Sequence, residues 1–164
     1  MNMTPINLVK QLTAQSITKE NFQSYGQVIY PASDDRFYDL NDAQLILDRG
    51  IPRFYIMRLY YRGRRFHQIT RHVQCTQCLG SLAGKEWLIA VALASSSKPV
   101  INEVVAFRIP GSCFIKLDVG TWHAGPYFDN DMVDFYSLEL SDTNINDHDT
   151  YNFWEDNCWE WEII

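Results

Sequence analysis

The stretch RHVQCTQCLGSLAG, residues 71–84, decides the fold of this chain. His72 is followed after four residues by Gln77, and six more residues separate Gln77 from Gly84. Further along, GTWHAG places His123 three positions after a glycine. A histidine on one strand and a side-chain oxygen just past the following bend can converge with a histidine from a distant strand. The spacing therefore predicts one polar site inside a β-structure.

The composition is that of an ordinary single domain. The chain has 164 residues, 46% hydrophobic and 21% charged, and we expect one domain spanning residues 1–164. No apolar run approaches the ~20 residues of a membrane span, and the first residues lack the apolar segment of a signal peptide, so we expect a cytoplasmic protein without a membrane partner. The net charge of −6 argues against nucleic acid as a partner, because phosphate binding needs a basic surface.

Two groups of side chains have a plain and a functional interpretation. Seven of the fourteen basic residues are arginines between Arg49 and Arg71, which form either a solvated face or a site for a small carboxylate. Two of the four cysteines form a CxxC, but the other two stand alone, so no second pair completes a zinc site. We expect four reduced and mostly buried cysteines: Cys75, Cys78, Cys113 and Cys158.

The residue pattern predicts an all-β fold after a short helical start. Thr18 can cap a helix in KENFQSY, and Gly26 can end it. Turn formers such as Arg62-Gly63 and Asp129-Asn130 separate short segments rich in β-branched and aromatic residues. These segments are VIYP, RFYIMRLYY, FHQITRHV, EWLIAVALA, VVAFRI, CFIKLDV, MVDFYSLEL and CWEWEII. Many short strands in a chain of this size indicate a β-sandwich or a small barrel.

The spacing of His72, Gln77 and Gly84 resembles the first motif of the cupin superfamily, and the glycine before His123 resembles the second. The resemblance implies a cupin-type jelly-roll β-barrel with a short N-terminal helix, and a metal site of His72, Gln77 and His123. An amide stands where cupins usually have a carboxylate, and Thr70 takes the place of the first histidine. The resemblance therefore implies a divalent metal (nickel, manganese or zinc) that is weakly held or absent.

A closer resemblance covers nearly the whole chain. RHVQCTQCLGSLAGKEWLIAVAL resembles the signature of the ureidoglycolate lyase family, in which an arginine-histidine pair leads to a small hydroxyl residue, a glutamine and a valine-rich strand. VVAFRIPG, Trp122-His123 and Asp134-Phe135 are similar to later segments of that family, and ITKENFQSYGQVI is similar to its opening. The resemblance implies a usually dimeric enzyme that cleaves ureidoglycolate to glyoxylate and urea in purine (allantoin) catabolism.

Three departures from that family imply a rebuilt pocket. Ala124 replaces a second histidine, Leu140 replaces an arginine, and residues 116–118 replace asparagine-tyrosine-histidine. Removal of the hydroxyl proton of ureidoglycolate lets its carbonyl form while the urea nitrogen leaves, and a histidine, a metal or a carboxylate can assist this step. The expected catalytic residues are His123, Asp118, Lys116 and Glu139, and the expected substrate-binding residues are Arg71 and Thr76.

Other interpretations remain open. Lys116 and Asp118 alternate with an apolar row, so they also fit a solvated strand face. The chain also fits a non-catalytic small-molecule-binding or regulatory cupin, or a cupin metalloenzyme of another type, although the missing first histidine counts against an iron oxygenase. Trp159 and Trp161 share a face with Ile163, and we expect this terminal strand to cover a barrel edge or to form the interface of a homodimer.

Overall fold

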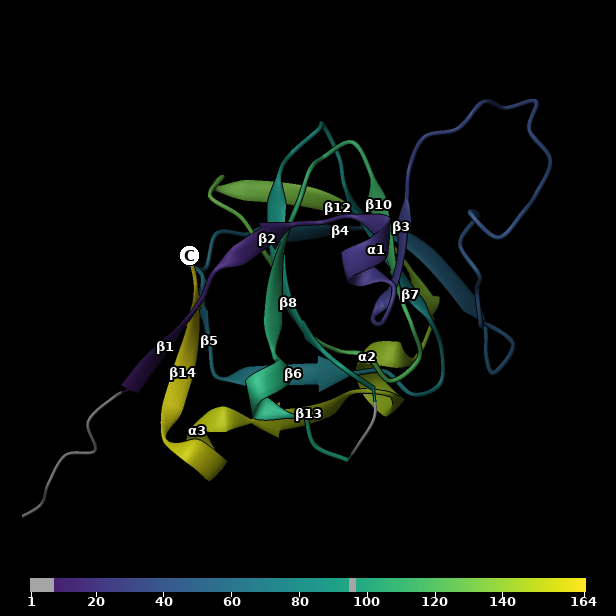
Figure 1. Ribbon diagram of the computed structural model, residues 1–164. Coiled ribbons are helices and arrows are strands. Elements are labelled where there is room, and N and C mark those ends of the chain that lie inside the picture. Colours follow the sequence, from purple (N-terminus) through teal and green to yellow (C-terminus); the bar gives the residue numbers. More distant parts are fainter. Residues whose placement is uncertain (1–7, 95–96) are drawn as a thin grey trace, which may run out of the picture.

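The computed structural model describes residues 8–94 and 97–164, and this part of the chain is mostly β-structure (Figure 1). The strands are β1 Leu8–Leu12, β2 Ala14–Ser16, β3 Gly26–Ile29, β4 Pro52–Tyr60, β5 Arg65–Phe66, β6 Gln68–Arg71, β7 Gln77–Ser81, β8 Trp87–Ala92, β9 Val105–Ile109, β10 Phe114–Leu117, β11 Trp122–Tyr127, β12 Met132–Leu140, β13 Asp149–Asn152 and β14 Trp159–Ile163. The helices are α1 Lys19–Phe22, η1 Ile101–Glu103, α2 Thr143–Asn146 and α3 Phe153–Asn157. Within the same ranges, no helix has the length and apolar character needed to cross a membrane. The expectation about a signal peptide falls partly on residues 1–7, outside the described residues.

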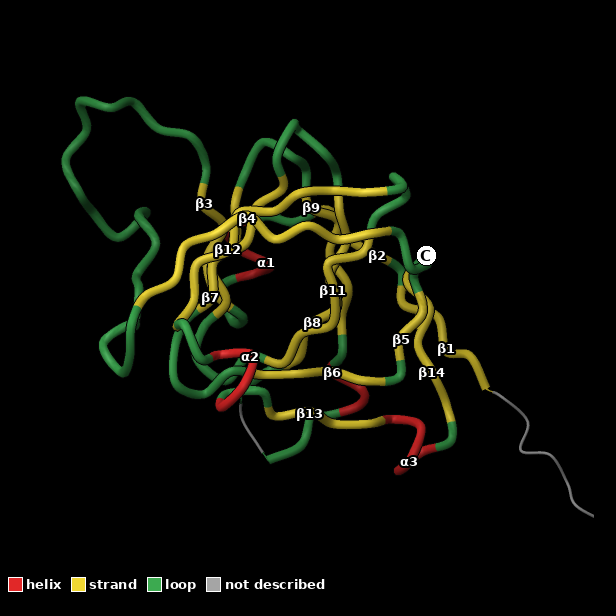
Figure 2. The backbone as a smooth tube through the Cα atoms, turned by 180° about the vertical axis from the view of Figure 1, so that it is seen from behind, coloured by secondary structure: helices red, strands yellow, loops and turns green. Residues whose placement is uncertain are grey.

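Two large sheets face each other, and a small third sheet lies beside them (Figures 1 and 2). The large sheets have the orders β3-β10-β7-β12-β4 and β13-β6-β11-β8-β9-β2, and the small one has the order β1-β14-β5. Among the described strands, the edges of one large sheet do not pair with those of the other. The fold is therefore the expected jelly-roll of the cupin type, and its two large sheets form an open sandwich rather than a closed barrel.

Alternation along the strands decides which side chains fill the space between the sheets. Ile89 and Val91 of β8 pack there against Leu79 of β7 and Phe135 of β12, which come from the opposite sheet. The residues that alternate with them along β8, such as Leu88 and Ala90, point to the other side of the six-stranded sheet and form a second core beneath the small sheet. Burial of each large apolar side chain contributes ~1.5–3 kcal/mol, so this alternation fixes which face of every strand is inside.

The predicted helical start is confirmed in a shorter form. Thr18 Oγ1 accepts a hydrogen bond from the Asn21 N–H at 3.1 Å, and Asn21 Oδ1 accepts one from the Thr18 N–H at 2.8 Å. This reciprocal capping box satisfies two N–H groups that a helix start leaves open. The helix ends at Phe22, and Gly26 begins β3.

The aromatic C-terminal strand is not an open edge. β14 lies between β1 and β5, with Trp161 and Ile163 buried against the second core. The Lys10 ammonium of β1 lies 3.3 Å from the centre of the Trp159 ring and covers it. The expected covering role is thus seen, but the argument for a homodimer through this strand was wrong, because both of its edges are already paired.

The cysteines in the described part of the chain are free thiols. Cys75 and Cys113 are buried and Cys78 is half-buried, as expected, whereas Cys158 is exposed. Burial raises the pKa of Cys78 to about 11, so its thiol stays protonated at neutral pH. The CxxC therefore packs as a pair of small hydrophobic residues.

The close approach of β3 to β10 requires glycine at position 26. A Cβ there would overlap the backbone carbonyl of Lys116, which cannot move without disturbing the sheet. We expect Gly26→Ala to lower the free energy of unfolding by ~2–4 kcal/mol in urea denaturation. Gly50→Ala is the matched control, because its Cβ would come no closer than 3.3 Å to the flexible Leu140 side chain. An equal effect of the two substitutions would contradict this interpretation.

Candidate functional site

His123 points into the space between the two large sheets. It lies opposite Val91 of β8 and Thr70 of β6 in the six-stranded sheet, and directly opposite residues share a face. Because Val91 belongs to the inner core, His123 and Thr70 also face inward. One end of the interior is thus polar, while the rest is filled by apolar side chains.

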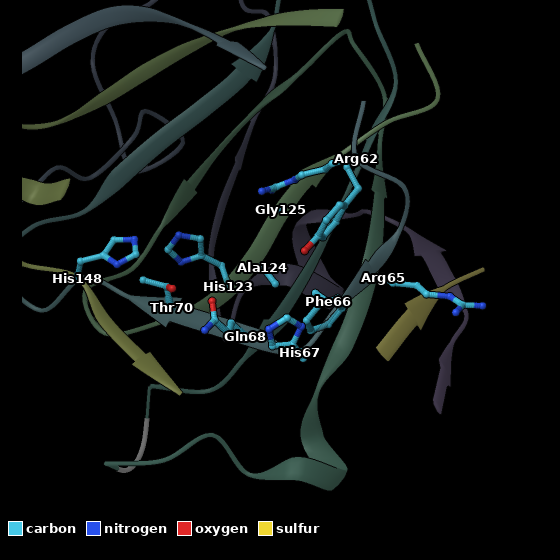
Figure 3. A pocket seen from close by; sticks show the side chains of 11 residues that line it. Arg62, Arg65, Phe66, His67, Gln68, Thr70, His123, Ala124, Gly125 and His148 are labelled. Carbon is cyan, nitrogen blue, oxygen red and sulfur yellow. The ribbon is translucent and has the colours of Figure 1, made fainter. Parts of the chain in front are cut away.

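Three imidazoles meet at this polar end. The His72 ring lies 5.0 Å from the His123 ring and 5.8 Å from the His148 ring, measured between centroids. Figure 3 shows the rings of His123 and His148 side by side, next to Thr70. The structure therefore brings together the two histidines that the sequence singled out, and it adds His148, which sequence reasoning missed.

Backbone carbonyls fix the orientation of two of these rings. His72 Nδ1 lies 2.6 Å from the carbonyl oxygen of Asp147, and His123 Nδ1 lies 3.3 Å from that of Thr121. A carbonyl only accepts, so each Nδ1 carries the hydrogen and each Nε2 keeps its lone pair. Burial lowers the pKa of His72, and burial together with the neighbouring His72 and His148 lowers the pKa of His123 to about 3. His123 is therefore a neutral hydrogen-bond acceptor at physiological pH.

Asp147 fixes the position of the His72 ring and of the loop that follows it. Its carboxylate accepts hydrogen bonds from the backbone N–H groups of Val73 at 2.7 Å and Gln74 at 2.8 Å, while its carbonyl binds His72. It thereby ties the loop after His72 to the segment that carries His148. The sequence does not predict these contacts of Asp147, because residues 142–148 show no strand or helix periodicity.

A pocket of about 380 Å³ opens in front of His123 and His148. Its lining is Arg62, Arg65, Phe66, His67, Gln68, Thr70, His123, Ala124, Gly125, Tyr127 and His148. In Figure 3 the Arg62 side chain extends over the pocket toward the histidines, whereas Arg65 points away. Arg62 donates to the carbonyl of Pro126 at 3.3 Å and stacks 4.8 Å from the Tyr127 ring centre.

The arginines around the pocket differ in their partners. Arg64 pairs with Asp129, and Arg65 pairs with Glu160 and Glu162. Among the residues that the structure describes, Arg62 forms no ion pair with a carboxylate. Its guanidinium is therefore the cation at the pocket that is open to a ligand carboxylate.

Gln77 and Glu139 form a buried pair on the inner face of the five-stranded sheet. Gln77 Nε2 donates to Glu139 Oε2 at 2.6 Å, and the Tyr55 hydroxyl donates to Glu139 Oε1 at 3.2 Å. Burial and the Glu139 charge raise the pKa of Tyr55, so the phenol stays protonated and keeps donating. The Glu139 charge also acts on His72, raising its pKa against the larger effect of burial, so the pair borders the imidazole cluster.

The other predicted residues lie elsewhere. A second cavity, of about 420 Å³, is lined by Lys116, Asp118 and Thr76. It lies beneath the long loop between β3 and β4, and Figure 2 shows this loop at one side of the molecule. Lys116 is buried and ion-paired with Asp118, whose side chain is 46% exposed, so Lys116 does not lie on a solvated face and neither residue lines the histidine pocket. Arg71 lies on the opposite side of the sheet from His72, 4.5 Å from the Trp122 ring centre, and it is ion-paired with Asp149.

The donor set does not fit a tightly held metal ion. Within residues 8–94 and 97–164, no group of three or more His, Cys, Asp or Glu side chains is arranged to hold one. His72 and His123 offer two neutral nitrogens and His148 lies nearby, while Gln77 donates through Nε2 to Glu139 and its Oε1 has no hydrogen-bond partner among the described residues. A divalent cation is bound weakly where such a group of three or four ligands is not formed.

Two comparisons with known proteins bear on these residues. A protein-family model described as Ureidoglycolate lyase matches residues 61–161, which carry all three imidazoles, Arg62, Gln77 and Glu139. No curated protein sequence matches the chain in a search of its whole length.

The low pKa of His123 predicts its behaviour in a pH titration. A histidine in the unfolded chain takes up a proton near pH 6.5, whereas His123 in the folded protein does so only at about pH 3. The unfolded chain therefore binds the proton first, and the free energy of unfolding decreases as the pH falls from about 6.5 to about 3. We expect the His123 Hε1 NMR signal to stay unchanged between about pH 8 and about pH 5. A midpoint near the ordinary histidine value would contradict the arrangement of this ring.

The donor set also predicts the metal content. We expect purified protein to contain less than about 0.1 equivalent of nickel, manganese or zinc by elemental analysis, because the described side chains do not form a group of three or more His, Cys, Asp or Glu ligands. Dialysis against EDTA should leave the unfolding temperature unchanged. A stoichiometric metal, or a large loss of stability on chelation, would show that further ligands close around the ion.

Proposed function

The chain belongs to the ureidoglycolate lyase family, and from this premise we propose that it cleaves ureidoglycolate, or a related small hydroxy or ureido acid, to glyoxylate and urea. The observation that carries the proposal is the neutral His123, whose free Nε2 belongs to a ring that lines a pocket beneath an open arginine. A hemiaminal acid needs a proton acceptor and a carboxylate anchor, and this pocket offers both.

His123 is the proposed proton acceptor. Its Nε2 takes the hydroxyl proton of the substrate, the oxygen electrons form the carbonyl of glyoxylate, and the carbon–nitrogen bond breaks with its electron pair on nitrogen. That nitrogen then takes a proton and leaves as urea, so no water, oxidant or reductant is consumed. Because burial disfavours the charged ring, the imidazolium returns its proton readily, and His148 stands beside it in the pocket.

Arg62 is the proposed carboxylate anchor. Its neighbours Arg64 and Arg65 are occupied by protein carboxylates, whereas Arg62 extends over the pocket (Figure 3). A guanidinium binds a carboxylate through two parallel hydrogen bonds, which orients the substrate as well as holding it. This role replaces the one that sequence reasoning gave to Arg71.

Glu139 and Gln77 act through other groups in this proposal. Glu139 does not line the pocket, but its negative charge favours a positive charge on the neighbouring His72. We propose that the carboxylate stabilises positive charge in the cluster through His72, whose ring lies 5.0 Å from that of His123. Gln77 and Tyr55 hold that carboxylate in place by donating to its two oxygens. We assign no step to a metal ion.

The decisive substitution is His123→Ala. We expect glyoxylate release from ureidoglycolate to fall ~10²–10⁴-fold, because a positioned proton acceptor contributes about that much, while the unfolding temperature changes little. Arg62→Ala should mainly raise KM, since it removes an interaction made before and during the reaction. Coupled assays of glyoxylate and urea measure both effects.

Asp118→Asn provides the comparison for these two variants, because Asp118 lies in the second cavity. If Asp118→Asn rather than His123→Ala shows the large loss, the base lies in the second cavity and the assignment is wrong. A wild-type protein that binds the substrate without turning it over would instead identify a non-catalytic binding protein.

A further inference from the structure

Four neighbouring strands of the five-stranded sheet place one row of side chains across its outer face. Lys116 of β10 lies directly opposite Cys78 of β7, and Cys78 lies opposite Leu138 of β12. Leu138 in turn lies opposite Phe54 of β4. Directly opposite residues share a face, and Lys116 points away from the inner core because the residues on either side of it in β10 pack into that core. The row therefore has a cation at one end and apolar side chains at the other.

An apolar cavity of about 150 Å³ lies over the apolar end of this row. The rings of Phe54 and Phe114 lie 5.8 and 5.6 Å from the ring of Tyr136, measured between centroids, so three aromatic side chains form one wall. Ala43 and Leu45, from the loop between β3 and β4, also line the cavity. A cavity of this size with aliphatic and aromatic walls accommodates a benzene ring.

The second cavity supplies a cation beside this apolar one, and Leu45 lines both. Lys116 is 5% exposed, and within residues 8–94 and 97–164 the acceptor that its ammonium meets is Asp118 Oδ1. An ammonium carries three N–H donors, so two remain for a ligand. The Asp118 side chain is 46% exposed, so water weakens this ion pair. The Lys116 ammonium can therefore bind an anionic group that enters the second cavity.

Hydrogen bonds fix the loop that covers both cavities. Gln27 Oε1 of β3 accepts from the Gln44 N–H at 2.8 Å, and its Nε2 donates to two carbonyls of the same loop at 3.1 and 3.3 Å. Thr76 Oγ1 accepts from the Ile46 N–H at 3.0 Å, and the Thr76 N–H donates to the Ile46 carbonyl at 3.1 Å. A ligand thus meets cavities that are already formed, and binding does not have to order the loop.

We propose that this outer face binds an aromatic carboxylic acid, with its ring in the apolar cavity and its carboxylate on the Lys116 ammonium. Cys78 lines the apolar cavity and lies one strand spacing, about 4.8 Å, from Lys116. Three carbon–carbon bonds of about 1.5 Å each span most of that separation, so two methylene groups between ring and carboxylate fit best. Burial raises the pKa of the Cys78 thiol to about 11, so a neutral group lies along the path of the ligand. The site is separate from the histidine pocket, because Gln77, the residue before Cys78, faces the interior.

Calorimetric titration of the full chain with 3-phenylpropionate tests the site. We expect binding, and the dissociation constant should be at least about tenfold higher for 3-phenylpropionamide, which keeps the ring but carries no charge. Propionate, which lacks the ring, should lose at least about tenfold as well. Failure of 3-phenylpropionate to bind, or equal affinity for the acid and its amide, would overturn the proposal.

Substitution of Lys116 tests the anchor. Lys116→Met should raise the dissociation constant of 3-phenylpropionate at least about tenfold, because it removes the ammonium and keeps an apolar stem of similar length. Lys85→Met is the matched control, since Lys85 is exposed and lines neither cavity, and this variant should bind as the wild type does. Equal binding by the two variants would show that the ammonium does not hold the carboxylate.

Filling the apolar cavity from the loop tests the site without a change to the buried ion pair. Ala43→Trp should abolish binding of 3-phenylpropionate, because its indole would take the place of the ligand ring. Ala32→Trp, in the same loop, lines neither cavity and should bind normally. Arg62→Ala, in the histidine pocket, should also bind normally. Normal binding by Ala43→Trp, or loss of binding in Arg62→Ala, would place the ligand elsewhere and refute the assignment.

Discussion

The register of β11 against β8 is the constraint on which the site depends. His123 lies opposite Val91 and Trp122 lies opposite Ala92, so the histidine faces the interior and the tryptophan faces the second core. A slip of one residue would exchange them and bury a large apolar ring where the pocket now stands. Glycines bound this pairing: Gly120 precedes the strand with a φ of +83°, and a Cβ on Gly125 would meet the Leu88 carbonyl at 3.0 Å. The segment GTWHAG, residues 120–125, therefore fixes the strand register as well as supplying the histidine.

Much of the fold could be predicted from the alternation of apolar and polar residues, and part of the site could be predicted from the spacing of its histidines. The strands were recognisable because one face of each is apolar, and His72 and His123 meet because one follows β6 and the other lies on the adjacent strand β11, on the inner side of the same sheet. His148 and Asp147 were not recognisable, since they lie in a segment without periodicity and act through backbone groups. For Lys116, alternation correctly predicted that the side chain points away from the inner core. It did not predict that this outer face is covered, because the cover is the loop between β3 and β4. Long-range covering by an irregular loop leaves no local pattern in the sequence.

The polar end of the interior carries features that a purely structural core would avoid. Glu139 is 1% exposed with three neutral donors as its partners, from Tyr55, Gln77 and Asn144, and Gln77 Oε1 has no hydrogen-bond partner among the described residues. A buried carboxylate and an unsatisfied amide oxygen both cost stability. Neutral imidazoles avoid a further cost, because two charged rings 5.0 Å apart would repel each other. Such departures from good packing concentrate at functional sites, where the chemistry retains them.

Strand β4 connects this interior to the surface. Its odd-numbered residues face inward, and among them Tyr55 donates to Glu139, the carboxylate next to the imidazoles. Among the described strands, β4 pairs with β12 alone, so the backbone that positions Tyr55 is held from one side. An edge strand held on one side frays more readily than one held on both. The position of Tyr55, and through it that of the Glu139 carboxylate, therefore depends on the pairing of β4 with β12.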